Sequence, residues 1–117
     1  IVESYAPAIE QAKLNAKQFT HVQAFALDAA KIAKLSIRPD CVIADPPRSG
    51  MDAKALTFLS TCGAKRIIYI SCNPSQLRRE LAWFSSYTCT SIALFDLFPQ
   101  TTHMEVVLEL VRKEYKP

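Results

Sequence analysis

Glycine is scarce in this chain of 117 residues, which contains only Gly50 and Gly63. Two glycines are few for a complete α/β nucleotide-binding domain, whose cofactor loop depends on glycine. The four cysteines form neither a CxxC pair nor a spacing shared with histidine, so the sequence predicts no metal site. No signal-peptide pattern or apolar run of membrane length is visible. We therefore expect a cytoplasmic protein whose thiols are free.

The overall composition is typical of a globular domain. Half of the residues are hydrophobic and 21% are charged, which argues against a disordered chain. The net charge of +3 is mildly basic, and it permits an RNA partner without establishing one. We expect one domain, because the sequence shows no repeats and no internal linkers.

The stretch 67–74, with the sequence IIYISCNP, organises the chain. Its first four residues are apolar and favour β structure, which predicts a strand buried on both faces. Asn73 is a good helix N-cap and Pro74 a good first helical residue, so a helix is expected to follow. Cys72 then lies between a strand end and a helix start, where open α/β sheets bind ligands and a helix terminus stabilises a thiolate. The alternative is a small packed cysteine at a strand end.

The rest of the chain alternates strands and helices, which predicts an α/β fold with a parallel sheet and right-handed crossovers. The last two strands lack a helix between them and are expected to pair antiparallel. Expected strands cover 1–3, 22–27, 41–44, 67–70, 91–95 and 105–111, and expected helices cover about 7–19, 29–35, 53–62 and 74–84.

Polar groups directly follow several of the expected strands. Glu3, Asp28, Asp45 and Cys72 are all in such positions, and the carboxyl ends of parallel strands share one edge of a sheet. An acid after an early strand commonly binds ribose hydroxyls in dinucleotide folds. The alternative for Glu3 or Asp28 alone is a solvated acid in a turn.

Two loops supply further candidate groups. The prolines of the stretch 45–48 (DPPR) stiffen it, so the Asp45 carboxylate is held in place and can grip the edge of a planar base. Glu105 heads an apolar strand beside His103, and partial burial suits it to act as a base. The alternatives are a rigid turn and surface residues of an edge strand. Cysteine, histidine and glutamate together also suit a hydrolase in which His103 activates Cys72.

Three motifs together resemble a known enzyme family. DPPRSG at 45–50, YISCNP at 69–74 and FPQTTHMEVV at 98–107 are similar, in this order and spacing, to the catalytic domain of the RNA uridine-5-methyltransferases. That family acts on tRNA or rRNA. The resemblance implies a Rossmann-like methyltransferase sheet, mostly parallel with an antiparallel last strand, S-adenosylmethionine as cofactor and RNA as partner.

The resemblance also implies a role for each matching residue. Cys72 is the nucleophile that adds to C6 of the uracil ring, and Glu105 removes the C5 proton so that Cys72 can leave. Asp45 holds the uracil edge and borders the cofactor. Glu3 and Asp28 contact the ribose and adenine side of the cofactor.

The family's first strand and glycine-rich turn have no counterpart in the sequence. On this reading residues 1–117 are the carboxyl-terminal portion of the catalytic domain, incomplete at its amino end. Alone they are expected to be inactive and to bind cofactor poorly. Residues 1–30 are then expected to re-dock, to pair with another copy of the chain, or to become mobile. The alternatives are a cysteine hydrolase and a non-catalytic binding fragment.

Overall fold

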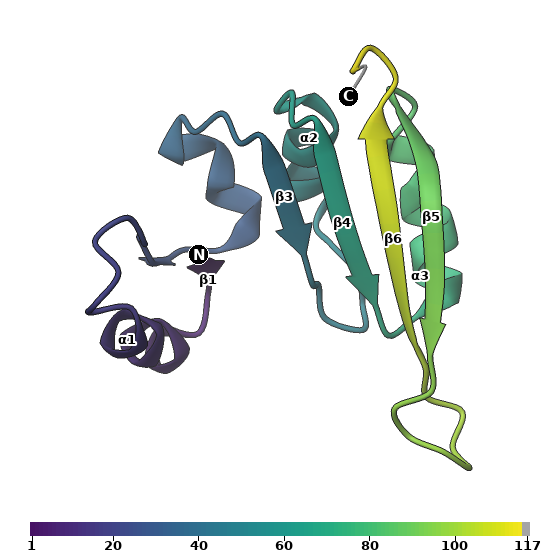
Figure 1. The fold of residues 1–117 in the computed structure, drawn as a ribbon, viewed down its shortest axis with the longest axis horizontal. Helices are drawn as coiled ribbons and strands as arrows, with labels where there is room; N and C mark the ends of the chain where they lie inside the picture. The colour runs from purple at the N-terminus through teal and green to yellow at the C-terminus, as the bar shows by residue number, and fades with distance from the viewer. Residues whose placement is uncertain (116–117) are drawn as a thin grey trace.

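The computed structural model describes residues 1–115, which form an α/β fold with two sheets (Figure 1). The strands are β1 (Val2–Glu3), β2 (Phe25–Ala26), β3 (Cys41–Ala44), β4 (Arg66–Ser71), β5 (Tyr87–Phe95) and β6 (Glu105–Arg112). The helices are α1 (Ala6–Asn15), α2 (Ala53–Thr61) and α3 (Pro74–Glu80), with 3-10 helices η1 (Ala29–Leu35) and η2 (Leu81–Trp83). Within residues 1–115, no helix has the length and apolar character needed to cross a bilayer.

The larger sheet has four strands in the order β3-β4-β6-β5. β3 and β4 are parallel, whereas β6 runs antiparallel to both β4 and β5. Helices α2 and α3 lie together on one face of this sheet (Figure 1). The antiparallel pairing of the last two strands is confirmed.

The smaller sheet consists of β1 and β2 alone, paired in parallel. The backbone N–H of Phe25 donates to the carbonyl of Ile1 at 2.9 Å, and that of Leu27 donates to Glu3 at 3.0 Å. Helix α1 contacts both strands and buries Ile9 completely. Residues 1–30 thus keep a sheet of their own and do not re-dock onto β3.

Local signals fixed several boundaries. The Asp52 carboxylate accepts a hydrogen bond from the backbone N–H of Lys54 at 2.8 Å and caps α2, which begins at Ala53, where a helix is predicted. Gly63 follows the end of that helix with a φ of +82°, the left-handed conformation that glycine adopts readily.

The predicted bounds of four elements were wrong. The helix expected over about 74–84 is α-helical only to Glu80 and continues as the 3-10 helix η2. Helix α1 ends at Asn15 instead of Phe19, because the backbone N–H groups of Lys17 and Phe19 bond only three residues back and Phe19 is exposed. β2 covers two residues, since β1 offers only two partners. β5 begins at Tyr87, because β6 is long enough to pair with its first residues.

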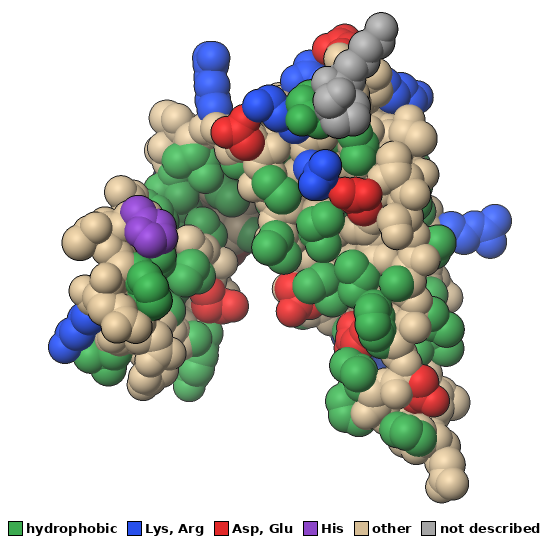
Figure 2. Space-filling model, in the orientation of Figure 1, with side chains coloured by type: hydrophobic (Ala, Val, Ile, Leu, Met, Phe, Trp, Pro, Cys, Tyr) green, Lys and Arg blue, Asp and Glu red, His purple; other side chains and the backbone are tan. Residues whose placement is uncertain are grey.

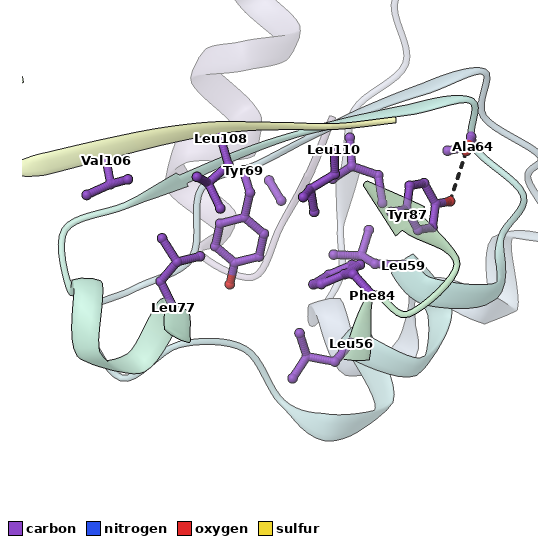
Figure 3. Packing of buried hydrophobic residues seen from close by; sticks show 12 residues of the cluster. Leu56, Leu59, Ala64, Tyr69, Leu77, Phe84, Tyr87, Val106, Leu108 and Leu110 are labelled. Atoms are coloured by element: carbon purple, nitrogen blue, oxygen red, sulfur yellow. Dashed lines mark hydrogen bonds between the residues drawn. The ribbon is translucent and has the colours of Figure 1, made fainter. Parts of the chain in front are cut away.

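The core lies between the four-stranded sheet and α2 and α3 (Figure 3). Tyr69, Phe84 and Tyr87 form a chain of edge-to-face rings, and the Tyr87 hydroxyl donates to the Ala64 carbonyl at 2.9 Å. Ile67 and Tyr69 are fully buried in this core.

The prediction that β4 is buried on both faces was wrong. The strand alternates, so Ile68 and Ile70 on the face opposite the helices are only half-buried. Helices α2 and α3 cover one face, which leaves the other face less protected.

We expect Ile67→Ala to lower the free energy of unfolding of residues 1–117 by about 2–5 kcal/mol, because it empties a fully buried site in the central strand. Ile43→Ala, on the neighbouring strand, is the control. That side chain is 72% exposed, so the expected loss is below about 0.5 kcal/mol. Urea unfolding measures both, and equal losses would contradict this description of the core.

Candidate functional site

Three predicted site residues lie at one edge of the four-stranded sheet. Cys72 directly follows β4, and Ser71 before it pairs with Val106, so Glu105 lies beside Cys72 across the antiparallel pair. β3 runs parallel to β4 and ends at Ala44, which places Asp45 at the same edge. Cys72 and Glu105 are half-buried, and Asp45 is exposed. The structure thus brings a thiol and two carboxyl groups to one end of three adjacent strands.

Hydrogen bonds join the loops that carry these residues. The Asn73 side chain caps α3 by accepting from the backbone N–H of Gln76 at 3.2 Å. The same side chain donates from Nδ2 to the carbonyl oxygen of Arg48 at 3.0 Å. Arg48 Nη1 in turn lies 3.4 Å from His103 Nδ1. Three segments far apart in the sequence are therefore tied together at the sheet edge.

A cleft of about 500 Å³ lies between β1 and β3. Glu3, Asp28 and Asp45 line it together with apolar side chains such as Ile32 and Ile37. Figure 2 shows the hollow, with acidic side chains on both of its walls. The cleft brings together the three residues predicted to contact a cofactor, whereas Cys72 and Glu105 are not among its lining residues.

Glu3, in β1, and Asp28, just after β2, also have local partners. Glu3 Oε1 accepts from the backbone N–H of Tyr5 at 2.8 Å and from the Ser4 hydroxyl at 3.2 Å. These bonds, the first above all, lower the pKa of Glu3 below its ordinary value and favour the ionised acceptor. Asp28 Oδ1 accepts from the backbone N–H of Ala30 at 2.8 Å and caps η1. One oxygen of each carboxylate therefore stabilises a turn.

The sequence reasoning missed a buried acid beside this edge. Glu80 is only 3% exposed, and its Oε1 accepts from the backbone N–H of Met51 at 2.8 Å. Oε1 also accepts from Gln76 Nε2 at 2.9 Å, while Oε2 accepts from the Tyr69 hydroxyl. Burial is the larger cause that raises the pKa of Tyr69 above its ordinary value, and the hydrogen bond with Glu80 raises it further.

A signal for Glu80 was present in the sequence. It follows Leu77 by three residues and precedes Phe84 by four, so it shares the apolar face of the helix. A glutamate on that face predicts a buried, hydrogen-bonded acid.

Comparison with known proteins gives consistent matches. A family model described as tRNA (uracil-5-)-methyltransferase matches residues 2–113. The 23S rRNA (uracil(747)-C(5))-methyltransferase RlmC of Shewanella oneidensis is 38% identical over 116 residues, which are 95% of this chain and 30% of that protein. An uncharacterized RNA methyltransferase of Bacillus cereus is 41% identical over 113 residues, or 91% of this chain and 25% of that protein. The chain thus spans less than a third of the length of these curated relatives.

Solved structures agree with these matches. The tRNA (uracil-54, C5)-methyltransferase of Pyrococcus abyssi, in complex with S-adenosyl-L-homocysteine, superposes with a TM-score of 0.80 at 32% identity. The match covers 94% of this chain and 28% of that one. The N-methyltransferase NodS of Bradyrhizobium japonicum has a TM-score of 0.72 at 14% identity, covering 97% of this chain and 65% of that one. The second likeness concerns the fold alone, and the two structures together agree with the predicted Rossmann-like methyltransferase fold.

The two hydrogen bonds of the Asn73 side chain, with Gln76 and with Arg48, can be tested separately by substitution. We expect Asn73→Ala to lower the free energy of unfolding by about 1 kcal/mol, because the cap of α3 is lost. Asn73→Asp keeps the capping oxygen and should unfold near the wild-type urea midpoint, but it cannot donate to Arg48. The backbone amides of Asp45 and of residues 48–50 should exchange faster with solvent in both variants. Unchanged exchange in Asn73→Asp would show that the contact with Arg48 does not hold the loop.

Proposed function

The chain belongs to the tRNA (uracil-5-)-methyltransferase family, and from this membership we propose that the complete protein methylates C5 of a uridine in tRNA or rRNA with S-adenosylmethionine. One structural observation carries the proposal beyond sequence similarity. The motifs at 45–50, 69–74 and 98–107 meet through the contacts of Arg48 with Asn73 and His103. Residues 1–117 are then the carboxyl-terminal portion of the catalytic domain.

The cleft between β1 and β3 fits the adenosine part of S-adenosylmethionine. Its volume of about 500 Å³ is within the range of small-molecule sites, and it combines apolar walls with carboxylates. Glu3 keeps a second carboxylate oxygen that can accept from ribose hydroxyls. Asp28 has a free oxygen for the adenine side, and Asp45 borders the same space. When bound, the cofactor supplies an electrophilic methyl group.

Cys72 begins the chemistry in this proposal. Carbon 5 of uracil is a weak nucleophile, so the base must be activated before it can accept a methyl group. The Cys72 thiolate adds to C6, forming a carbon–sulfur bond and leaving an enolate in which C5 is nucleophilic. The position of Cys72 beside the start of α3, half-buried but reachable, suits this addition.

Glu105 and Asp45 complete the cycle. After methylation, Glu105 takes the proton from C5, the bond between C6 and the Cys72 sulfur breaks, and the thiolate leaves. Glu105 is suited to this step because the antiparallel register holds it next to Cys72. Asp45, in its proline-stiffened loop, holds the edge of the uracil.

RNA is the proposed macromolecular partner. The target uridine has to be splayed out of its stack to reach a group at the sheet edge. Arg78 and Arg79 are exposed in the last turn of α3, the helix that follows Cys72, and they provide positive charge for contacts with RNA phosphates.

The hydrolase alternative has less support. It requires His103 to activate Cys72, but His103 Nδ1 faces the guanidinium of Arg48. Within residues 1–115 no hydrogen bond joins His103 to Cys72. A ring nitrogen beside an arginine donor is poorly placed to take a proton from a thiol.

The function is tested by measuring 5-methyluridine in digested RNA after incubation with the complete protein and S-adenosylmethionine. We expect Cys72→Ala to abolish the product, because the thiolate that adds to C6 is lost. Cys62→Ala is the matched control: this thiol is half-buried as well, but it lies at the end of α2 and should keep activity. Product formation by Cys72→Ala at the wild-type rate would reject the proposed nucleophile.

A further inference from the structure

Glu80 is a buried acid for which the proposed reaction has no use. Its side chain touches β4 through Tyr69, α3 through Gln76 and the loop before α2 through Met51. All three partners are uncharged hydrogen-bond donors. Burying a carboxylate costs free energy because its hydration is lost. A glutamate that is 3% exposed therefore needs hydrogen bonds that offset this cost.

The loop is built to receive this carboxylate. Gly50 has a φ of +85°, and a Cβ atom added there would lie 1.9 Å from Glu80 Oε1 and 2.7 Å from Gln76 Cγ. Any side chain at Gly50 would therefore displace Glu80. The backbone N–H of Gly50 also donates to the Pro47 carbonyl at 2.8 Å, which closes the turn that follows Asp45.

Helix α3 consequently holds the loop at two points. Asn73, the N-cap residue, donates to the carbonyl of Arg48. Glu80, at its last residue, holds the backbone N–H of Met51. Between these two points the segment from Arg48 to Met51 is fixed to the same helix that begins beside Cys72.

We propose that Glu80 is a positioning residue that clamps the 45–51 loop to α3 and β4, and so sets where Asp45 lies relative to Cys72. The inference rests on the proposed function, since it assigns Glu80 a part in the same reaction. Glu80 does not touch the reacting atoms. It acts through Met51 and the turn closed by Gly50.

The test uses the complete protein and compares two substitutions of Glu80. Glu80→Ala removes all three bonds and should reduce kcat for RNA methylation at least tenfold, with a smaller change in KM for RNA. Glu80→Gln keeps an oxygen for the Met51 N–H, and its amide can donate to the Tyr69 oxygen. It should therefore remain within about threefold of wild type.

Gly50 tests the clamp from the other side. Gly50→Ala should match Glu80→Ala in its loss of kcat. The variant that carries both substitutions should have a kcat no more than about twofold below that of the worse single variant. The reason is that each single substitution already breaks the same contact between Glu80 and the loop. Gly63→Ala is the matched control: its φ of +82° imposes similar backbone strain, but its nearest contact is the flexible end of Arg112, so kcat should be unchanged.

Exchange of the Met51 backbone amide provides a readout independent of activity. We expect it to rise at least tenfold in Glu80→Ala and Gly50→Ala, but not in Glu80→Gln or Gly63→Ala. Wild-type kcat in Glu80→Ala, equal losses in Glu80→Ala and Glu80→Gln, or unchanged Met51 exchange would each overturn the proposal. If Glu80→Ala does not fold, the proposal is decided by comparing kcat and Met51 exchange in Gly50→Ala with those in Gly63→Ala. If the wild-type protein makes no 5-methyluridine, the proposed function fails, while Met51 exchange still decides whether the clamp exists.

Discussion

Strand β4 forms backbone ladders with a parallel neighbour, β3, on one side and an antiparallel neighbour, β6, on the other. Its register with β6 sets Glu105 beside Cys72, and its register with β3 brings Asp45 to the same edge. A slip of one residue would turn Tyr69 out of the core, so burial fixes the register strongly. The positions of Cys72, Glu105 and Asp45 thus depend on hydrophobic packing on the face of the sheet that α2 and α3 cover.

Strand register alone does not place the loops that follow the strands. Helix α3 does this with polar side chains at both of its ends, Asn73 and Glu80. Each satisfies a backbone group of the 45–51 loop, and Arg48 carries the connection on to His103. Short, directional contacts therefore complete an arrangement that the nonpolar core begins, which is how a rigid scaffold commonly supports functional loops.

Much of this arrangement could be predicted from the sequence. Strong local signals, such as the Asp52 cap, Gly63 and the run before Cys72, gave the correct elements, and three motifs gave the family. The predictions failed where a partner decides the outcome: β2 is short because β1 is short, and β5 is long because β6 is long. The Glu80 bonds were missed because they join segments that are distant in sequence. The roles of Cys72, Glu105 and Asp45 remain predictions.

The central claim is that Cys72 and Glu105 act in turn on one uracil ring. The most direct measurement incubates the Glu105→Gln variant of the complete protein with uridine-containing RNA and S-adenosylmethionine, followed by mass mapping of covalent protein–RNA adducts. The account predicts a methylated adduct on Cys72 that accumulates, because the C5 proton cannot be removed. Glu109→Gln, on the same strand but bonded to Arg66, should release product normally. Normal turnover by Glu105→Gln, or an adduct on another residue, would contradict the account.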